Sequence, residues 1–203
     1  MATKVTPLSG FPEFLPAERL LELSFLDTIR EVFELHGLAP IETRAVEPVE
    51  RLVGKGGDAD KEIYAVGRLA ARGEESGESD LGLHFDLTVP FARYVLEHAG
   101  RLSFPFRRYQ IQKVWRGERP QEGRFREFTQ ADIDVVDVGA LAPHFEAEMP
   151  LVIAEAFARL PIGEFRIQVN NRRIPEGFYR GIGLTDVAGT LRIVDKLDKI
   201  GPE

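Results

Sequence analysis

The chain contains no cysteine, which excludes disulfide bonds, thiolate nucleophiles and cysteine-ligated zinc. No apolar run reaches the roughly 18 residues that a membrane-spanning helix needs, and no secretory signal precedes Pro7. The four histidines are scattered, and no two have the spacing of metal ligands. A Ser–His–Asp order and an H-E-x-x-H motif are also missing, so hydrolases have little support. We therefore expect a cytoplasmic protein with no membrane segment and no site for a resident metal.

The composition is that of a folded, mildly acidic protein. Of the 203 residues, 43% are hydrophobic, which is enough for one substantial core. There are 33 acidic and 26 basic side chains, and the net charge is −7. This balance argues against a surface that coats nucleic acid generally, although it leaves room for a local basic face.

Hydrophobic periodicity predicts helices and strands in mixed order. The predicted helices cover residues 17–36, 88–97, 142–160, 174–182 and 187–199. The predicted strands cover residues 40–46, 62–66, 81–85, 106–116, 126–136 and 164–170. Gly37 is the expected C-cap of the first helix, and loops are expected at residues 54–60 and 73–80. Because loops and hairpins join most strands, the fold class is α+β, with a mixed, mainly antiparallel β-sheet flanked by helices.

Four arginines and a Pro/Gly turn lie between the two longest predicted strands, in residues 115–130. Arg116 and Glu118 share one face of the first strand, and Arg124 and Phe128 share one face at the start of the second. The arginine fork binds phosphate or carboxylate, and a phenyl ring can stack on a base. Two interpretations remain open: a nucleotide held on an antiparallel sheet, or a charged hairpin whose Arg and Glu side chains pair in solvent.

Polar side chains alternate along the second of these strands, where Gln130, Asp132 and Asp134 share a face. A polar row on a central strand is costly unless each side chain is satisfied, so it indicates either a pocket lining or the solvated side of the sheet. In the strand before it, one face carries Tyr109, Ile111 and Lys113, and the opposite face carries Gln110, Gln112 and Val114.

Two junctions also have double interpretations. Asp86-Leu87-Thr88 joins a strand to a helix, where it could cap the helix or present a carboxylate and a hydroxyl to a bound ammonium group. The run Asn170-Asn171-Arg172-Arg173 closes a predicted strand, where it could bind phosphate or shape a turn.

These residues resemble a known family. Arg116-x-Glu118, a variable loop and Arg124-x-x-x-Phe128 resemble motif 2 of the class II aminoacyl-tRNA synthetases. Four further strings resemble the histidyl-tRNA synthetases, especially their eukaryote-like branch: LHFDLTVPFARY (83–94), RFREFTQADID (124–134), VNNRRI (169–174) and VDKLDK (194–199). The resemblance runs from about Pro7 to the last residue.

The resemblance implies ATP-dependent activation of L-histidine to histidyl-adenylate, followed by transfer to tRNA(His). Arg116 would be the catalytic residue and would hold both the ATP α-phosphate and the histidine carboxylate. For ATP, Glu118 would contact adenine, Arg124 the γ-phosphate, and Phe128 would stack on the base. The residues implied to bind histidine are Asp86, Leu87, Thr88, Arg116, Gln130 and Asp134, the last of these at the imidazole. Mg²⁺ is expected with ATP, its ligands cannot be placed, and a homodimer is implied.

The chain also departs from the family pattern. Arg44 stands where motif 1 of the family carries a proline, and His84 and Phe85 replace the more usual Arg and Tyr or Pro. Residues 1–203 would form a partial class II core with motifs 1 and 2. Motif 3 and the anticodon-binding domain would lie beyond them, so we expect the piece alone to be inactive. The alternative is a non-catalytic histidine-sensing paralogue, such as the regulatory subunit of ATP phosphoribosyltransferase. A pure interaction module is a third interpretation.

Overall fold

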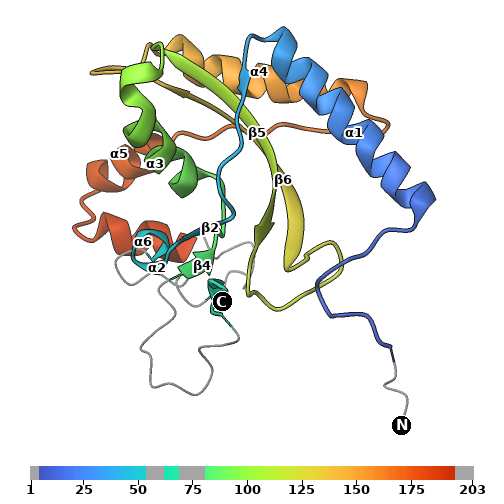
Figure 1. Ribbon diagram of the computed structural model, residues 1–203. Coiled ribbons are helices and arrows are strands. Elements are labelled where there is room, and N and C mark those ends of the chain that lie inside the picture. The colour runs from blue at the N-terminus through green and yellow to red at the C-terminus, as the bar shows by residue number, and fades with distance from the viewer. Residues whose placement is uncertain (1–4, 54–61, 69–80, 195–203) are drawn as a thin grey trace. The chain divides into compact units, whose positions relative to one another are not determined.

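The computed structural model describes residues 5–53, 62–68 and 81–194 (Figure 1). The chain divides into two compact units, Met1–Gly163 and Glu164–Glu203. The loops expected at residues 54–60 and 73–80 and the string at 195–199 lie outside the described residues. The helices of the first unit are α1 (Pro16–Leu35), α2 (Val49–Leu52), α3 (Thr88–His98), the short η3 (Ala99–Arg101) and α4 (His144–Arg159).

The first unit is built around a three-stranded sheet with the order β1-β5-β6. Its strands are β1 (Ala39–Pro40), β5 (Phe106–Trp115) and β6 (Glu127–Val136). β5 and β6 pair antiparallel along their whole length, and β1 runs parallel to β5. The two longest predicted strands, the antiparallel sheet and the α+β class are therefore confirmed.

One face of β5 and β6 carries the apolar core. Tyr109, Ile111 and Ile133 pack there against buried side chains of the two longest helices, α1 and α4, which run beside the sheet in Figure 1. Val32 of α1 and Val152 of α4 are fully buried, and burying such a side chain stabilises a fold by about 1.5–3 kcal/mol. The helices predicted at residues 17–36 and 142–160 are confirmed.

The end of α1 is built by a glycine, as predicted. The N–H of Gly37 donates to the carbonyl of Glu34 at 2.9 Å, and the N–H of Leu38 donates to that of Phe33 at 3.1 Å. These bonds satisfy carbonyls that the last helical turn leaves free. Gly37 has a φ of 71°, which a residue without a side chain adopts without strain. The chain then turns back, and Leu38 enters the core.

A second, smaller sheet has the order β2-β4-β3 and is antiparallel throughout. Its strands are β2 (Val46–Pro48), β3 (Ala65–Val66) and β4 (Leu81–Leu83), so the strands expected at 62–66 and 81–85 do pair. The fully buried His84 joins this sheet to β5. Its N–H donates to the carbonyl of Ala45 at 3.0 Å, and its Nε2 lies 2.7 Å from the carbonyl oxygen of Lys113.

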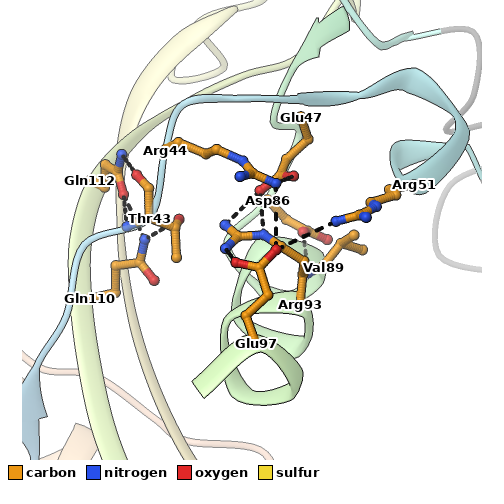
Figure 2. A network of polar contacts seen from close by, with 10 residues as sticks. All are labelled: Thr43, Arg44, Glu47, Arg51, Asp86, Val89, Arg93, Glu97, Gln110 and Gln112. Atoms are coloured by element: carbon orange, nitrogen blue, oxygen red, sulfur yellow. Dashed lines mark hydrogen bonds and ion pairs between the residues drawn. The ribbon is translucent and has the colours of Figure 1, made fainter. Parts of the chain in front are cut away.

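A buried ion-pair network fixes α3 against β2 (Figure 2). Glu47 of β2 is only 1% exposed. Arg93 of α3 donates to its Oε1 from Nε at 2.9 Å and from Nη2 at 2.7 Å. Arg44 donates to its Oε2 at 2.9 Å, and Arg93 also reaches Glu97 at 2.8 Å. Arg44, found in place of the expected proline, is therefore part of the anchor that sets the position of α3.

The strand expected at residues 40–46 is wrong, because only its two ends, Pro40 and Val46, lie in strands. Side chains of β5 bind the middle of this segment instead (Figure 2). Gln112 donates to the carbonyl of Thr43 at 2.8 Å and accepts from its N–H at 3.4 Å. Gln110 donates to the hydroxyl of Thr43 at 2.9 Å. Backbone groups that a neighbouring strand would satisfy are satisfied here by two amides.

The second unit is helical in its described residues, with α5 (Arg173–Gly181) and α6 (Val187–Val194), so both predicted helices are found. The strand expected at residues 164–170 is wrong: no residue of that segment is in a strand. The described part of this unit offers no second strand to pair with it, and a lone strand is not stable. Asn171 accepts the N–H of Arg173 at 3.0 Å, which confirms the turn-shaping interpretation. Among the described residues, no helix is both long and apolar enough to cross a membrane.

Tyr109 offers a test of how α1 is held to the sheet. Its hydroxyl donates to Glu34 at 2.7 Å, and burial, with the neighbouring Glu34 carboxylate, raises the pKa of Tyr109 from 10.0 to about 12. Tyr109→Phe should destabilise the fold by about 1.5–3 kcal/mol near neutral pH. Because the fold favours the protonated phenol, this contribution should be present below pH 10 and lost as the pH rises toward 12. Denaturant unfolding at several pH values measures it, with Tyr94→Phe as control. A loss that is the same at pH 8 and pH 12 would contradict this account.

The Glu47 network makes a second prediction. Arg93→Met leaves a buried carboxylate with only Arg44 beside it and should cost about 3–5 kcal/mol of stability. Arg44→Met removes a half-exposed partner of the same carboxylate and should cost no more than about 1 kcal/mol. Equal losses in the two variants, measured by denaturant unfolding, would show that burial does not govern the network.

Candidate active site

The face of β5 and β6 opposite the core is polar. The antiparallel register places Arg108 opposite Asp134, Gln112 opposite Gln130, and Gln110 opposite Asp132, and residues in such pairs point to the same side. Gln130, Asp132 and Asp134 therefore share a face, as predicted. This face is not simply solvated, because Arg108 and Gln110 are fully buried. The burial argues against a fully solvated face, and the pocket-lining interpretation stays a prediction.

Three carboxylates gather at the α3 end of this face. Burial raises the pKa of Asp134, Arg108 opposes that rise through an ion pair, and the charges of Asp132 and Asp86 add to it. Gln130 donates to both oxygens of Asp132 at 2.8 Å. Three neighbouring acidic groups in a half-buried place repel one another, and a bound cation relieves that repulsion. The arrangement therefore suits a positively charged or hydrogen-donating ligand.

Asp86 does cap α3, as the local interpretation held. Its Oδ1 accepts the N–H of Thr88 at 3.1 Å and that of Val89 at 3.2 Å. Leu87, between Asp86 and Thr88, is fully buried and fixes the turn. Both hydrogen bonds use Oδ1, so the cap does not occupy Oδ2. Capping and ligand binding are thus compatible in one carboxylate.

The guanidinium of Arg116 lies near two aromatic rings and near the three carboxylates described above. Its guanidinium carbon lies 4.6 Å from the ring centroid of Phe85 and 5.0 Å from that of Phe128. Its Nε donates to the carbonyl of Phe85 at 3.2 Å, and its Nη2 reaches Gln130 at 3.4 Å. These contacts hold the fork in place and bring Arg116, Phe128 and Gln130 together, as the family resemblance implied. The contribution of Phe85 was not predicted.

The loop between β5 and β6 is a tight hairpin. Arg116 donates its N–H to the carbonyl of Arg126 at 2.8 Å, and Gln121 and Arg124 exchange two backbone bonds at 3.2 and 3.0 Å. Gly123 has a φ of 72°, which makes this turn possible without strain. The loop therefore presents its charged side chains from a defined backbone.

Two of the predicted ATP-binding residues contact each other. Arg124 forms an ion pair with Glu118, and the hydrogen bond from Arg124 lowers the pKa of Glu118. The charged-hairpin interpretation describes this exposed pair correctly. Glu62 lies beside it: burial and the nearby Glu118 raise the pKa of Glu62. Gly117 allows this approach, since its N–H donates to the Glu62 carbonyl at 2.7 Å and an added Cβ would lie 3.0 Å from that oxygen.

Sequence reasoning missed several residues of this site. Arg108 could have been found from strand alternation combined with the antiparallel register, because both place it opposite Asp134. Glu62 and Phe85 come from other parts of the chain, and no local pattern signals their approach. The described residues contain no group of three or more His, Asp or Glu side chains that could hold a metal ion.

Comparison with known proteins agrees with this geometry. The sequence model of the family described as "Histidyl-tRNA synthetase" matches residues 10–195 of the chain. The histidine–tRNA ligase of Micrococcus luteus is 65% identical over 97% of this chain and 45% of its own length. The crystal structure of histidyl-tRNA synthetase from Nostoc sp. PCC 7120 is 41% identical, with a TM-score of 0.83 over 98% of this chain and 43% of that one.

A more distant structure shows the same fold. It is described as an ATP phosphoribosyltransferase regulatory subunit/histidyl-tRNA synthetase from Bacillus halodurans C. It is 22% identical, with a TM-score of 0.60 over 77% of this chain and 39% of that one. The chain spans about 45% of the length of the curated relatives it matches. Because the family match covers nearly all of it, the chain belongs to the histidyl-tRNA synthetase family.

Proposed function

We propose that the protein carrying this chain is a histidine–tRNA ligase, which activates L-histidine with ATP and transfers it to tRNA(His). Family membership supports the proposal. The observation that carries it is that groups of opposite charge lie close together. Asp132 and Asp134 of β6 and Asp86 ahead of α3 form a group of carboxylates, and the guanidinium of Arg116 contacts Gln130, which donates to Asp132. An amino acid bound there has its cation near the carboxylates and its own carboxylate near the arginine.

The first step needs no nucleophile from the protein. A carboxylate oxygen of histidine attacks the α-phosphorus of ATP, the bond from that phosphorus to the bridging oxygen breaks, and pyrophosphate leaves. Negative charge grows on the phosphoryl oxygens as this happens, and a fixed guanidinium stabilises it. Arg116 fits this role because two rings and two hydrogen bonds already fix its orientation. In the second step the terminal ribose of tRNA(His) attacks the acyl carbon and AMP leaves.

ATP would lie along the hairpin. In this proposal Phe128 stacks on the base, Glu118 contacts adenine and Arg124 contacts the γ-phosphate. Arg124 and Glu118 must then exchange their mutual ion pair for the nucleotide. That exchange costs little, because the Arg124 side chain is 52% exposed and exposed pairs contribute about 0–1 kcal/mol. Mg²⁺ would arrive with the ATP phosphates, because the described residues offer no ligand cluster for it.

Histidine would lie across the carboxylates. In this proposal the α-ammonium contacts Asp86, Thr88 and Gln130, with Leu87 fixing their turn, and the imidazole contacts Asp134. Residues 1–203 would be the first part of a class II catalytic core, and later segments would supply motif 3 and the anticodon-binding domain. We also infer a homodimer that acts in the cytoplasm.

A non-catalytic histidine sensor is not favoured. Such a protein needs no ATP-binding residues, yet Arg116, Glu118, Arg124 and Phe128 are all present. Curated relatives that are 60–65% identical to this chain are themselves called histidine–tRNA ligases.

ATP–pyrophosphate exchange dependent on histidine tests the proposal. The full-length protein should catalyse it, whereas residues 1–203 alone should be close to background, since in this proposal motif 3 belongs to a later segment. Exchange by the 203-residue piece at the full-length rate would show that later segments are not needed for the activation step. Calorimetry on the full-length protein that detects histidine binding but no ATP binding would favour the sensor.

Arg116→Ala in the full-length protein should lower the exchange rate about 10²-fold or more, because it removes a preorganised charge stabiliser. Arg19→Ala, which removes an exposed arginine of α1, is the control and should leave the rate unchanged. A wild-type rate for Arg116→Ala would remove this residue from its assigned role.

A further inference from the structure

Arg108 is a buried cation that the proposed chemistry does not use. Its side chain is 0% exposed, and its guanidinium carbon lies 4.3 Å from the ring centroid of Phe91 on α3. Its Nη1 reaches Gln110 only at 3.5 Å. Its Nε and Nη2 have no hydrogen-bond partner among the described residues, and Nη2 is held by an ion pair with Asp134. Burial lowers the pKa of Arg108, so this position is costly for a charge. Two described carboxylates oppose this effect: Asp134, which forms an ion pair with Arg108 across the strand pair, and Asp132.

Asp134 depends on this arginine in turn. Burial raises its pKa, Arg108 lowers it, and the charges of Asp132 on β6 and Asp86 ahead of α3 raise it. Arg108 is the only positive group among these neighbours. Without it, a half-buried carboxyl facing two other carboxylates would retain its proton closer to neutral pH.

The ion pair also leaves one oxygen for a ligand. Arg108 pairs with Oδ2 of Asp134, which leaves Oδ1 for a substrate. An ionised carboxylate only accepts hydrogen bonds, and a site that requires a donor rejects analogues that lack one. A ring N–H, as in imidazole, satisfies this requirement.

We propose that Arg108 is a positioning and specificity residue for histidine: it holds the Asp134 carboxylate ionised and oriented so that Oδ1 accepts the imidazole N–H. This inference rests on the proposed function, in which Asp134 contacts the imidazole. Arg108 touches no substrate, and it acts through Asp134 alone.

The test uses the full-length protein and histidine-dependent ATP–pyrophosphate exchange between pH 5 and 9. Arg108→Gln should raise KM for histidine about tenfold or more at neutral pH, since each unit of pKa rise above the pH lowers the ionised fraction tenfold. KM for ATP should stay within about twofold, because only the histidine contact is lost. The acid limb of kcat/KM for histidine should move to higher pH, because histidine binding is lost as the pH falls through the raised pKa of Asp134.

Arg107→Gln is the matched control. Arg107 is the neighbouring arginine on the same strand, faces the other side and pairs with Glu148 at 2.5 Å, so its removal should leave the pH profile unchanged. An unchanged acid limb in Arg108→Gln, or equal losses for ATP and histidine, would overturn the inference.

If Arg108→Gln does not fold, Arg108→Lys is the variant that tests the inference. It keeps the charge, so the acid limb should stay near the wild-type pH while KM for histidine rises. When Asp134→Asn is combined with the Arg108 substitution, the double variant should raise KM for histidine by much less than the two single effects together. Fully additive effects would overturn the inference. Wild-type protein that catalyses no exchange would instead overturn the proposed function and this inference with it.

Discussion

The antiparallel pairing of β5 with β6 gives the first unit two faces of opposite character, because side chains alternate along each strand. On one side Tyr109, Ile111 and Ile133 pack against α1 and α4. On the other, every opposed pair from Arg108–Asp134 to Gln112–Gln130 is polar. A shift of register by one residue would exchange the faces, so the packing of α1 and α4 also determines where Asp134 and Gln130 lie. The core and the candidate site are therefore fixed by the same set of backbone hydrogen bonds.

The segments that surround the polar face reach it through side chains rather than through the strand ladder. Thr43 is held by the amides of Gln110 and Gln112, and α3 is held by the pairing of Arg93 with Glu47. Both contacts bury polar groups, which costs free energy unless each is satisfied. Such contacts fix the position of one element against another more than they stabilise the fold. The pairing of Arg93 with Glu47 therefore also fixes the N-terminus of α3, which Asp86 caps.

Local patterns were sufficient wherever one face of an element determines its structure. The long helices, the two long strands, the glycine that ends α1 and the shared face of Gln130 and Asp134 were all predicted. The strands expected at 40–46 and 164–170 were wrong because alternation cannot reveal whether a partner strand exists. In the site, the proximity of Arg116, Phe128 and Gln130 was implied by the family resemblance and not by spacing. The approach of Glu62 and Phe85 was not predicted, since it depends on tertiary structure. Arg108 lies in a predicted strand, but its role could not be predicted, because that role depends on the register that places it opposite Asp134.

The two halves of the site differ in how firmly their charges are held. Glu118 and Arg124 form an exposed pair on a hairpin, which is weak and can rearrange around a nucleotide at low cost. Arg108 is fully buried and Asp134 about one-third exposed, so that pair is set by the sheet before any ligand arrives. Preorganised groups discriminate between ligands better than adaptable ones, because a poorly matched ligand cannot induce them to rearrange. In the proposed function, histidine would therefore meet a preorganised side of the site and ATP an adaptable one.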